Sequence, residues 1–272
     1  MRVALAQFTA GPDKEANLDR MAGITAEAAG AGAALMLFPE CAMAHLPDRP
    51  LTPAAEPVDG PFVRGLAAAA RRHRVAVVAG IFEAIPGADH VFNTVVALDA
   101  AGARLGTYRK LHMYDAFGFR ESDRMRAGDG DTLLFTVAGT VFGVQTCYDV
   151  RFPEFSRHLA ASGAEVILLP SAWVQGLLKE SHWEVLVRAR AIENTVYVAA
   201  AGQAGRSFTG SSMLVDPMGV AVARAGDVDA LLVGEVDGER IRSVRRRNPS
   251  LENARPDVYA RWTPLEAGSP RS

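Results

Sequence analysis

The sequence predicts an α/β fold built from two similar halves within one domain. Three observations carry this prediction: short apolar runs alternate with longer segments rich in alanine, leucine and arginine, the runs are continuously apolar, and their order occurs twice. With 272 residues, the chain is long enough to bury a large core without disulfides or metal ions. Length alone would allow one or two domains.

Continuously apolar runs are typical of strands that are buried on both faces of a sheet. They occur at Val3–Phe8, Ala33–Phe38, Val75–Phe82, Phe92–Leu98, Val141–Cys147, Val166–Leu169, Val196–Ala201, Ser212–Val215 and Leu231–Val236. Helices are predicted over Lys14–Ala29, Pro61–His73, Pro153–Ser162, Ser181–Asn194 and Gly238–Arg247. Pro61 and Pro153 suit the first turn of a helix, and Gly30 and Gly163 suit the point where one ends.

The order of elements is the same in residues 2–98 and in residues 141–215. Each stretch predicts a strand, a helix, a strand, a loop, a helix and two strands, and the second strand ends in Leu-Phe-Pro-Glu at 37–40 or Leu-Leu-Pro-Ser at 168–171. We interpret this as internal duplication; the alternative is chance recurrence of a common βαβ order. We expect one domain over residues 1–260 and a C-terminal tail over 261–272. The prolines from Arg255 onward predict an extended arm.

The charge balance and the apolar patterning exclude several classes of function. Lys+Arg total 29 against 31 for Asp+Glu, so no nucleic-acid partner is expected, and the arginines between 240 and 247 fit a solvated helix face. The N-terminus lacks the basic and apolar regions of a signal peptide. No apolar stretch approaches the roughly 18 residues that a membrane span needs. The two cysteines, Cys41 and Cys147, indicate reduced thiols, and we expect a cytoplasmic location.

Several common cofactor and catalytic motifs are missing from the sequence. It has no phosphate-binding loop, no complete dinucleotide fingerprint, no zinc-ligand spacing and no Gly-x-Ser-x-Gly motif. The six histidines are scattered, which favours structural roles over metal ligation. We therefore expect neither a metal ion nor an organic cofactor.

The segment around Cys147 carries the most chemical information. A hydrophobic strand is predicted to end on this cysteine, turn sharply and enter a helix at Pro153. Such a turn lies where α/β proteins bind ligands, and the backbone N–H groups that follow it face a developing oxyanion. The nearby helix N-terminus would lower the pKa of the thiol. The alternative is a small buried hydrophobic residue, which is the commoner fate of a free cysteine.

Two charged residues in other segments are further candidates. Glu40 comes after an apolar strand and Pro39, and apolar surroundings would raise the pKa of its carboxyl group, as suits a general base. The alternative for Glu40 is a surface loop. Lys110 would supply a cation for an oxyanion, although a single lysine is usually a solvated charge. Cys41 is expected to pack beside Glu40.

Together these segments resemble the nitrilase superfamily of carbon–nitrogen hydrolases. The resemblance rests on Phe-Pro-Glu at 38–40, Tyr-Arg-Lys-x-His at 108–112 and Cys-Tyr-Asp-x-Arg-Phe-Pro-Glu at 147–154, and it extends through segments at 181–194, 215–219 and 255–259. It implies a four-layer α-β-β-α sandwich, homodimers or larger homo-oligomers, and no metal or organic cofactor. It also implies a catalytic triad of Glu40, Lys110 and Cys147, with Glu121 as a second glutamate. The loop over 114–119 looks shorter than in mammalian-type members, which leaves the substrate contacts open.

The resemblance implies a mechanism through a thioester on Cys147. Glu40 takes the thiol proton, and Lys110 with the backbone N–H of Tyr148 holds the oxyanion. Glu40 then protonates the departing amine and activates water. Glu121 positions groups in the site.

The flank of the cysteine resembles the branch of ω-amidases and deaminated glutathione amidases. True nitrilases usually carry tryptophan where this chain has Tyr148. We expect a small linear amide that carries a carboxylate, such as 2-oxoglutaramate; the alternatives are deaminated glutathione amidase, nitrilase or N-carbamoyl amide hydrolase activity, or a catalytically silent binding module. Tyr114, Phe117 and Trp173 are candidate pocket residues or core residues. Arg151 is a candidate carboxylate ligand, or a partner of Asp149 or Glu154.

Overall fold

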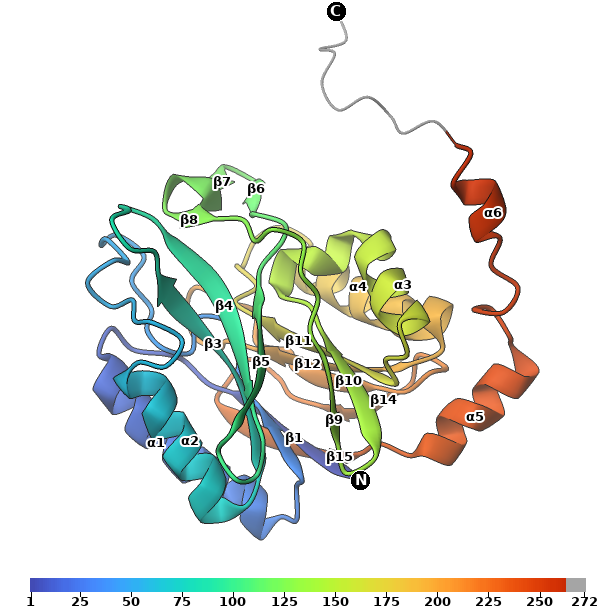
Figure 1. The fold of residues 1–272 in the computed structure, drawn as a ribbon, viewed down its shortest axis with the longest axis horizontal. Coiled ribbons are helices and arrows are strands. Elements are labelled where there is room, and N and C mark those ends of the chain that lie inside the picture. Colours follow the sequence, from blue (N-terminus) through green and yellow to red (C-terminus); the bar gives the residue numbers. More distant parts are fainter. Residues whose placement is uncertain (263–272) are drawn as a thin grey trace, which may run out of the picture.

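The computed structural model describes residues 1–262, which form two β-sheets packed face to face between pairs of helices (Figure 1). The first sheet has the strand order β15-β1-β2-β3-β4-β5, with β8 paired to β4. Its strands are β1 (Arg2–Gln7), β2 (Leu35–Leu37), β3 (Ala76–Ala84), β4 (Val91–Leu98), β5 (Arg104–Arg109), β8 (Met125–Arg126) and β15 (Ala230–Glu235). The short strands β6 (Asp115–Ala116) and β7 (Phe119–Arg120) form a separate hairpin.

The second sheet has the order β14-β13-β12-β11-β10-β9. Its strands are β9 (Leu134–Val137), β10 (Thr140–Val144), β11 (Val166–Ser171), β12 (Tyr197–Gly202), β13 (Met213–Val215) and β14 (Ala221–Arg224). The helices are α1 (Lys14–Gly30), α2 (Pro61–His73), α3 (Pro153–Ala161), α4 (Lys179–Asn194), α5 (Gly238–Arg247) and α6 (Pro256–Tyr259), with 3₁₀ turns η1 (Glu121–Asp123) and η2 (Cys147–Arg151).

The two sheets have the same construction, as the repeated order of elements predicts. In each, three parallel strands (β1-β2-β3 or β10-β11-β12) are followed by two antiparallel ones (β4-β5 or β13-β14). An antiparallel edge strand, β15 or β9, lies beside the first strand of each series. Helices α1 and α2 cover the outer face of the first sheet, and α3 and α4 cover the second (Figure 1). The predicted four-layer α-β-β-α sandwich is therefore confirmed.

In the first sheet, alternating side chains divide a strand between two cores. Val3 and Leu5 of β1 belong to the core between the sheets, whereas Ala4 and Ala6 lie in the core beneath α1 and α2. Both faces of the central strands are buried, which explains why their sequences are apolar without alternation.

Six strands were not predicted, among them the two-residue strands β6, β7 and β8, and some predicted boundaries are wrong. β5, β9 and β14 lie at or near sheet edges and have mixed exposed and buried positions, so they lack a continuous apolar run. β10 ends at Val144 and not at Cys147, because the chain leaves the sheet at Gln145. The arm predicted as extended from Arg255 contains the helical turn α6. Most of the predicted tail, residues 263–272, lies outside the described residues.

Candidate active site

The carboxyl ends of three strands bring the predicted residues together. Glu40 follows β2, Lys110 follows β5 directly, and Cys147 follows β10, while Glu121 begins the turn η1. All four line one cavity of about 220 Å³. The backbone of Glu40 lies close to Gly80 of β3. A Cβ atom at position 80 would be only 2.8 Å from the Cα atom of Glu40, so this approach requires glycine.

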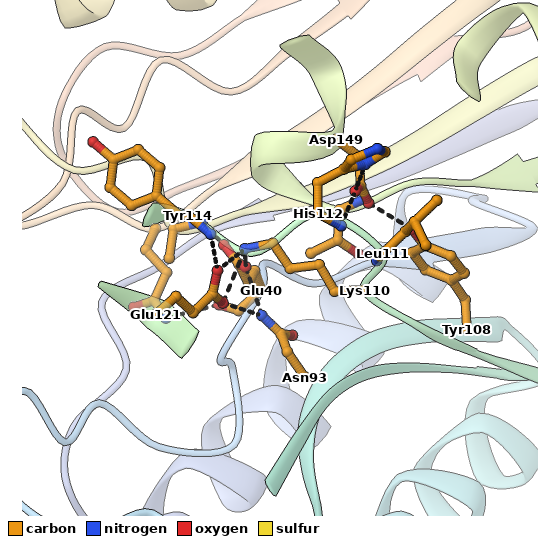
Figure 2. Close-up of polar contacts among 12 residues, drawn as sticks. Glu40, Asn93, Tyr108, Lys110, Leu111, His112, Tyr114, Glu121 and Asp149 are labelled. Carbon is orange, nitrogen blue, oxygen red and sulfur yellow. Dashed lines mark hydrogen bonds and ion pairs between the residues drawn. The ribbon is translucent and has the colours of Figure 1, made fainter. Parts of the chain in front are cut away.

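Glu40 is buried and accepts hydrogen bonds on both carboxylate oxygens. Oε1 accepts from Lys110 Nζ at 2.9 Å and from Asn93 Nδ2 at 2.7 Å, and Oε2 accepts from the backbone N–H of Ala172 at 2.7 Å (Figure 2). Burial alone would raise the pKa of Glu40, but the charge and hydrogen bonds of Lys110 hold it below its ordinary value. The sequence-based expectation of a raised pKa is therefore wrong, because apolar strands surround a site that contains its own cation.

Lys110 lies between two carboxylates and is almost completely buried. Its Nζ atom is 2.7 Å from Glu121 Oε2 and 2.9 Å from Glu40 Oε1. Asn93 joins the same two carboxylates, and the backbone N–H of Tyr114 donates to Glu121 at 2.6 Å (Figure 2). Burial opposes the ammonium charge, but the two glutamates raise the pKa of Lys110 well above its ordinary value. Lys110 is thus a fixed cation in the cavity.

Cys147 is the first residue of η2 and adopts a left-handed backbone conformation with φ of 46°. Burial raises the pKa of its thiol, and the charge of Glu40 raises it further. The expected lowering by a helix N-terminus is therefore wrong, since desolvation outweighs it. The Glu40 carboxylate and the Ser171 hydroxyl both lie beside the thiol. A protonated thiol beside a carboxylate requires that carboxylate to act as a base.

Asp149 holds the turn that carries Cys147, a role that sequence reasoning missed. Its carboxylate accepts from Tyr108 Oη at 2.6 Å, from the Thr146 N–H at 2.8 Å, and from the backbone and ring nitrogens of His112 at 3.1 and 2.8 Å. The His112 ring also stacks on Phe152, with centroids 3.6 Å apart. The sequence does contain a signal for this role, because Tyr108 lies in the motif at 108–112 and Asp149 lies in the motif at 147–154.

Of the predicted substrate-binding residues, only Tyr114 lines the cavity. Tyr148 packs edge-to-face on Tyr114 at 5.1 Å, and its backbone N–H lies in the first turn of η2, where amides have no intrahelical acceptor. Arg151 pairs with neither Asp149 nor Glu154 within residues 1–262; it lies over the rings of Phe117 and Trp173. These three residues form a neighbouring cluster beyond Tyr114.

The remaining cavity lining comes from loops and strands that the motifs do not cover. It is largely apolar and includes Cys41, Ala44, Leu46, Leu51, Phe82, Phe119, Met125, Val174 and Phe208. Arg124 fixes one side, because its guanidinium donates to the carbonyl groups of Leu46, Pro47 and Arg49. Cys41 is half-buried and faces the cavity as well as packing beside Glu40. In the described part of the chain, no group of three acidic, histidine or cysteine side chains could hold a metal ion, and no helix is long and apolar enough to cross a membrane.

The four-layer sandwich and the cavity with its glutamate, lysine and cysteine are features of one family of enzymes, and comparison with known families identifies it. The carbon–nitrogen hydrolase family matches residues 2–246, so the chain belongs to this family, within the nitrilase superfamily. It is a cysteine-dependent amidase, an enzyme that hydrolyses carbon–nitrogen bonds other than peptide bonds.

Similar individual proteins are amidases. The deaminated glutathione amidase of Escherichia coli O157:H7 is 39% identical over 94% of this chain and 97% of its own length. The human deaminated glutathione amidase is 37% identical over 94% of this chain and 83% of its own. A cysteine-to-alanine mutant of an amidase from Nesterenkonia sp. AN1, solved with butyramide, is 28% identical with a TM-score of 0.83, covering 97% of both chains. Another mutant of that amidase carries acrylamide at its active-site cysteine.

Proposed function

We propose that the protein hydrolyses a small linear primary amide that carries a carboxylate, an ω-amide of an oxo- or dicarboxylic acid such as 2-oxoglutaramate. The products are the acid and ammonia. The observation that carries the proposal is the arrangement of Glu40, Lys110 and Cys147, all buried, around one cavity. The similarity to deaminated glutathione amidases and the sequence at 147–154 support a substrate with a carboxylate.

In the proposed mechanism Glu40 removes the thiol proton as Cys147 attacks the amide carbon. Lys110 and the backbone N–H of Tyr148 stabilise the oxyanion of the tetrahedral intermediate. Glu40 returns the proton to the nitrogen, the C–N bond breaks, and ammonia leaves a thioester on Cys147. Glu40 then takes a proton from water, which attacks the thioester. The C–S bond breaks, Glu40 returns the proton to the sulfur of Cys147, and the acid leaves. Glu121 keeps Lys110 oriented throughout, because both of its oxygens accept from Nζ.

Ammonia release from a panel of primary amides tests this function, with ω-amides of oxo-acids included. Cys147→Ala, Glu40→Gln and Lys110→Ala should each abolish release, whereas Cys41→Ala should retain it. If Cys41→Ala abolished turnover and Cys147→Ala did not, the assignment of the nucleophile would be wrong. Absence of turnover across the whole panel would favour a binding module, carbon dioxide release would indicate an N-carbamoyl amide hydrolase, and acid formed equally fast from nitriles would indicate a nitrilase.

A second candidate substrate is deaminated glutathione itself, which the names of the 39% and 37% identical relatives favour. Its scissile nitrogen carries a substituent, so hydrolysis yields an amine in place of ammonia. Measuring free amine and ammonia in parallel separates the two candidates. The better substrate is the one with the higher kcat/KM.

A further inference from the structure

We propose that Lys179 and Arg151 form an anion subsite beside the active-site cavity, which binds the carboxylate of the substrate. The subsite would make these residues determinants of specificity for acidic amides. This inference rests on the proposed amidase function and assigns the carboxylate to particular side chains. It starts from an oddity of composition: only three of the 29 basic residues are lysines.

The three lysines differ in their partners. Lys14 pairs with Glu56, and Lys110 pairs with Glu40 and Glu121. Lys179 is only 3% exposed, yet within residues 1–262 no carboxylate forms an ion pair with it. Its Nζ atom donates to Tyr114 Oη at 3.0 Å and otherwise faces aromatic rings. A buried ammonium group without an anion is costly, and such exceptions are expected at functional sites.

Arg151 adds a second positive charge to the same aromatic surface. Both the Lys179 ammonium and the Arg151 guanidinium lie over the rings of Phe117 and Trp173, at 4.4–5.6 Å from the ring centroids. The guanidinium also contacts His182 at 3.3 Å, and its buried Nε atom has no hydrogen-bond partner in the described chain. The rings offset part of the cost through cation–π attraction, but no carboxylate within residues 1–262 forms an ion pair with either cation.

The helix that carries Lys179 makes this position still more positive. Lys179 is the first residue of α4, where the helix dipole disfavours a cation and attracts an anion. Burial lowers the pKa of Lys179, and the charge of Arg151 lowers it further. A bound carboxylate would offset the unfavourable helix dipole and the repulsion between the two cations, because it would pair with both cations and with the helix N-terminus.

Tyr114 connects this cluster with the reacting atoms. Its ring lines the cavity together with Glu40 and Cys147, its backbone N–H binds Glu121, and its hydroxyl binds Lys179. Arg151 belongs to the same turn, η2, as Cys147. An amide bound at Cys147 therefore needs to extend only past Tyr114 for its far carboxylate to reach the two cations.

A matched pair of substrates tests the subsite. Succinamate carries a carboxylate, and 4-methylpentanamide replaces that group with an isopropyl group of similar shape. Lys179→Met should lower kcat/KM for succinamate about 10- to 100-fold, the usual range for a lost charge-assisted hydrogen bond, and change kcat/KM for 4-methylpentanamide less than about twofold. Arg151→Met should act in the same direction, and Lys179→Arg should retain most of the preference. The control is Arg72→Met on the exposed face of α2, which should change neither value.

Equal effects of Lys179→Met on both amides, or no effect on either, would overturn the subsite while leaving the amidase function intact. If the wild-type enzyme hydrolysed neither amide, the proposed substrate would be wrong, and calorimetry of succinate with Cys147→Ala would decide on the subsite. There, Lys179→Met should weaken succinate binding at least about tenfold, and unchanged binding would refute the subsite. Inorganic phosphate that competed as strongly as succinate would refute its assignment to carboxylates.

Discussion

The pKa values of Glu40 and Cys147 shift in opposite directions. For Glu40, burial is outweighed by Lys110, which keeps the carboxylate ionised, whereas burial and the Glu40 charge keep the Cys147 thiol protonated. The resting pair is therefore a carboxylate and a thiol. This differs from a thiolate stabilised by an adjacent cation, and it makes deprotonation part of each attack.

This pairing predicts the pH dependence of catalysis. Activity requires ionised Glu40, whose pKa lies below the ordinary 4.5, so kcat/KM should fall only as the pH drops through that lowered value. On the alkaline side, the thiol and the Lys110 ammonium both keep their protons because both pKa values are raised. We expect kcat/KM to be flat from about pH 6 to about pH 9. A rise centred near the ordinary thiol pKa of 9.0 would show instead that a free thiolate attacks.

The sequence predicted the residues at strand ends and missed those that hold them. Glu40, Lys110 and Cys147 are visible because each stands in a distinctive motif. Asn93 lies within the apolar strand β4, and only tertiary structure shows that its amide joins Glu40 and Glu121. Lys179 has no motif at all, since its significance depends on the lack of an ion-pair partner among the described residues.

At the scale of elements, the proposed mechanism depends most on η2. Cys147 is held at a φ of 46°, and the Asp149 side chain caps this turn through the N–H of Thr146. The sequence predicted a sharp turn here but not the left-handed backbone of Cys147, because non-glycine residues rarely adopt this conformation and nothing in the sequence marks it. The predicted strand included Gln145 and Thr146, whereas the observed strand ends at Val144.

Removal of the Asp149 charge should disturb this turn more than the rest of the fold. One carboxylate oxygen accepts from Tyr108 and Thr146, and the other accepts from the two nitrogens of His112. An asparagine side chain has only one acceptor oxygen, so one of these two sets of donors would lose its acceptor. We expect Asp149→Asn to reduce kcat about 10-fold or more and to lower the free energy of unfolding by about 1–3 kcal/mol. Urea denaturation and steady-state kinetics measure the two effects. Asp59→Asn, at an exposed position, is the control, and an Asp149→Asn enzyme with wild-type kcat would contradict the role of this cap.

At the scale of the whole molecule, the site is divided between the two halves. Glu40 comes from the first sheet and Cys147 from the second, so catalysis depends on how the sheets are joined. Gln203, directly after β12, forms one such link. Its Nε2 donates to the carbonyl groups of Glu40 and Cys41 at 2.9 and 3.1 Å, and its Oε1 accepts from the N–H of Ala10 at 3.0 Å.

Replacement of Gln203 should therefore affect both stability and catalysis. Gln203→Leu leaves three buried backbone groups without a partner, and each costs about 1–3 kcal/mol. We expect a lower melting temperature and a kcat reduced at least about tenfold, because a small displacement of Glu40 weakens proton transfer. Gln175→Leu, which removes a side-chain amide from a more exposed loop, is the control. A loss of stability with unchanged kcat would show that Gln203 joins the halves without positioning Glu40.

The outer surface of the second half leads to a prediction about assembly. Ile192 on α4, together with Met218 and Val220 between β13 and β14, is about half-exposed. These side chains border a groove of about 540 Å³ that also includes Pro217 and Val244. Clustered apolar side chains on a surface indicate an interface, and a two-fold axis would place the same patch on both sides of it. The resemblance to the superfamily implied a homo-oligomer, so we expect a second copy of this chain to cover the groove.

Light scattering after size-exclusion chromatography tests this arrangement. The wild-type protein should elute as a dimer or larger species, and Val220→Asp should shift it toward the monomer, because burial of a charged carboxylate in the interface is costly. Val228→Asp places the same charge at a position 68% exposed, away from the groove, and should leave the assembly unchanged. A monomeric wild-type protein would refute the oligomer. An oligomer that Val220→Asp does not weaken would place the interface on another surface.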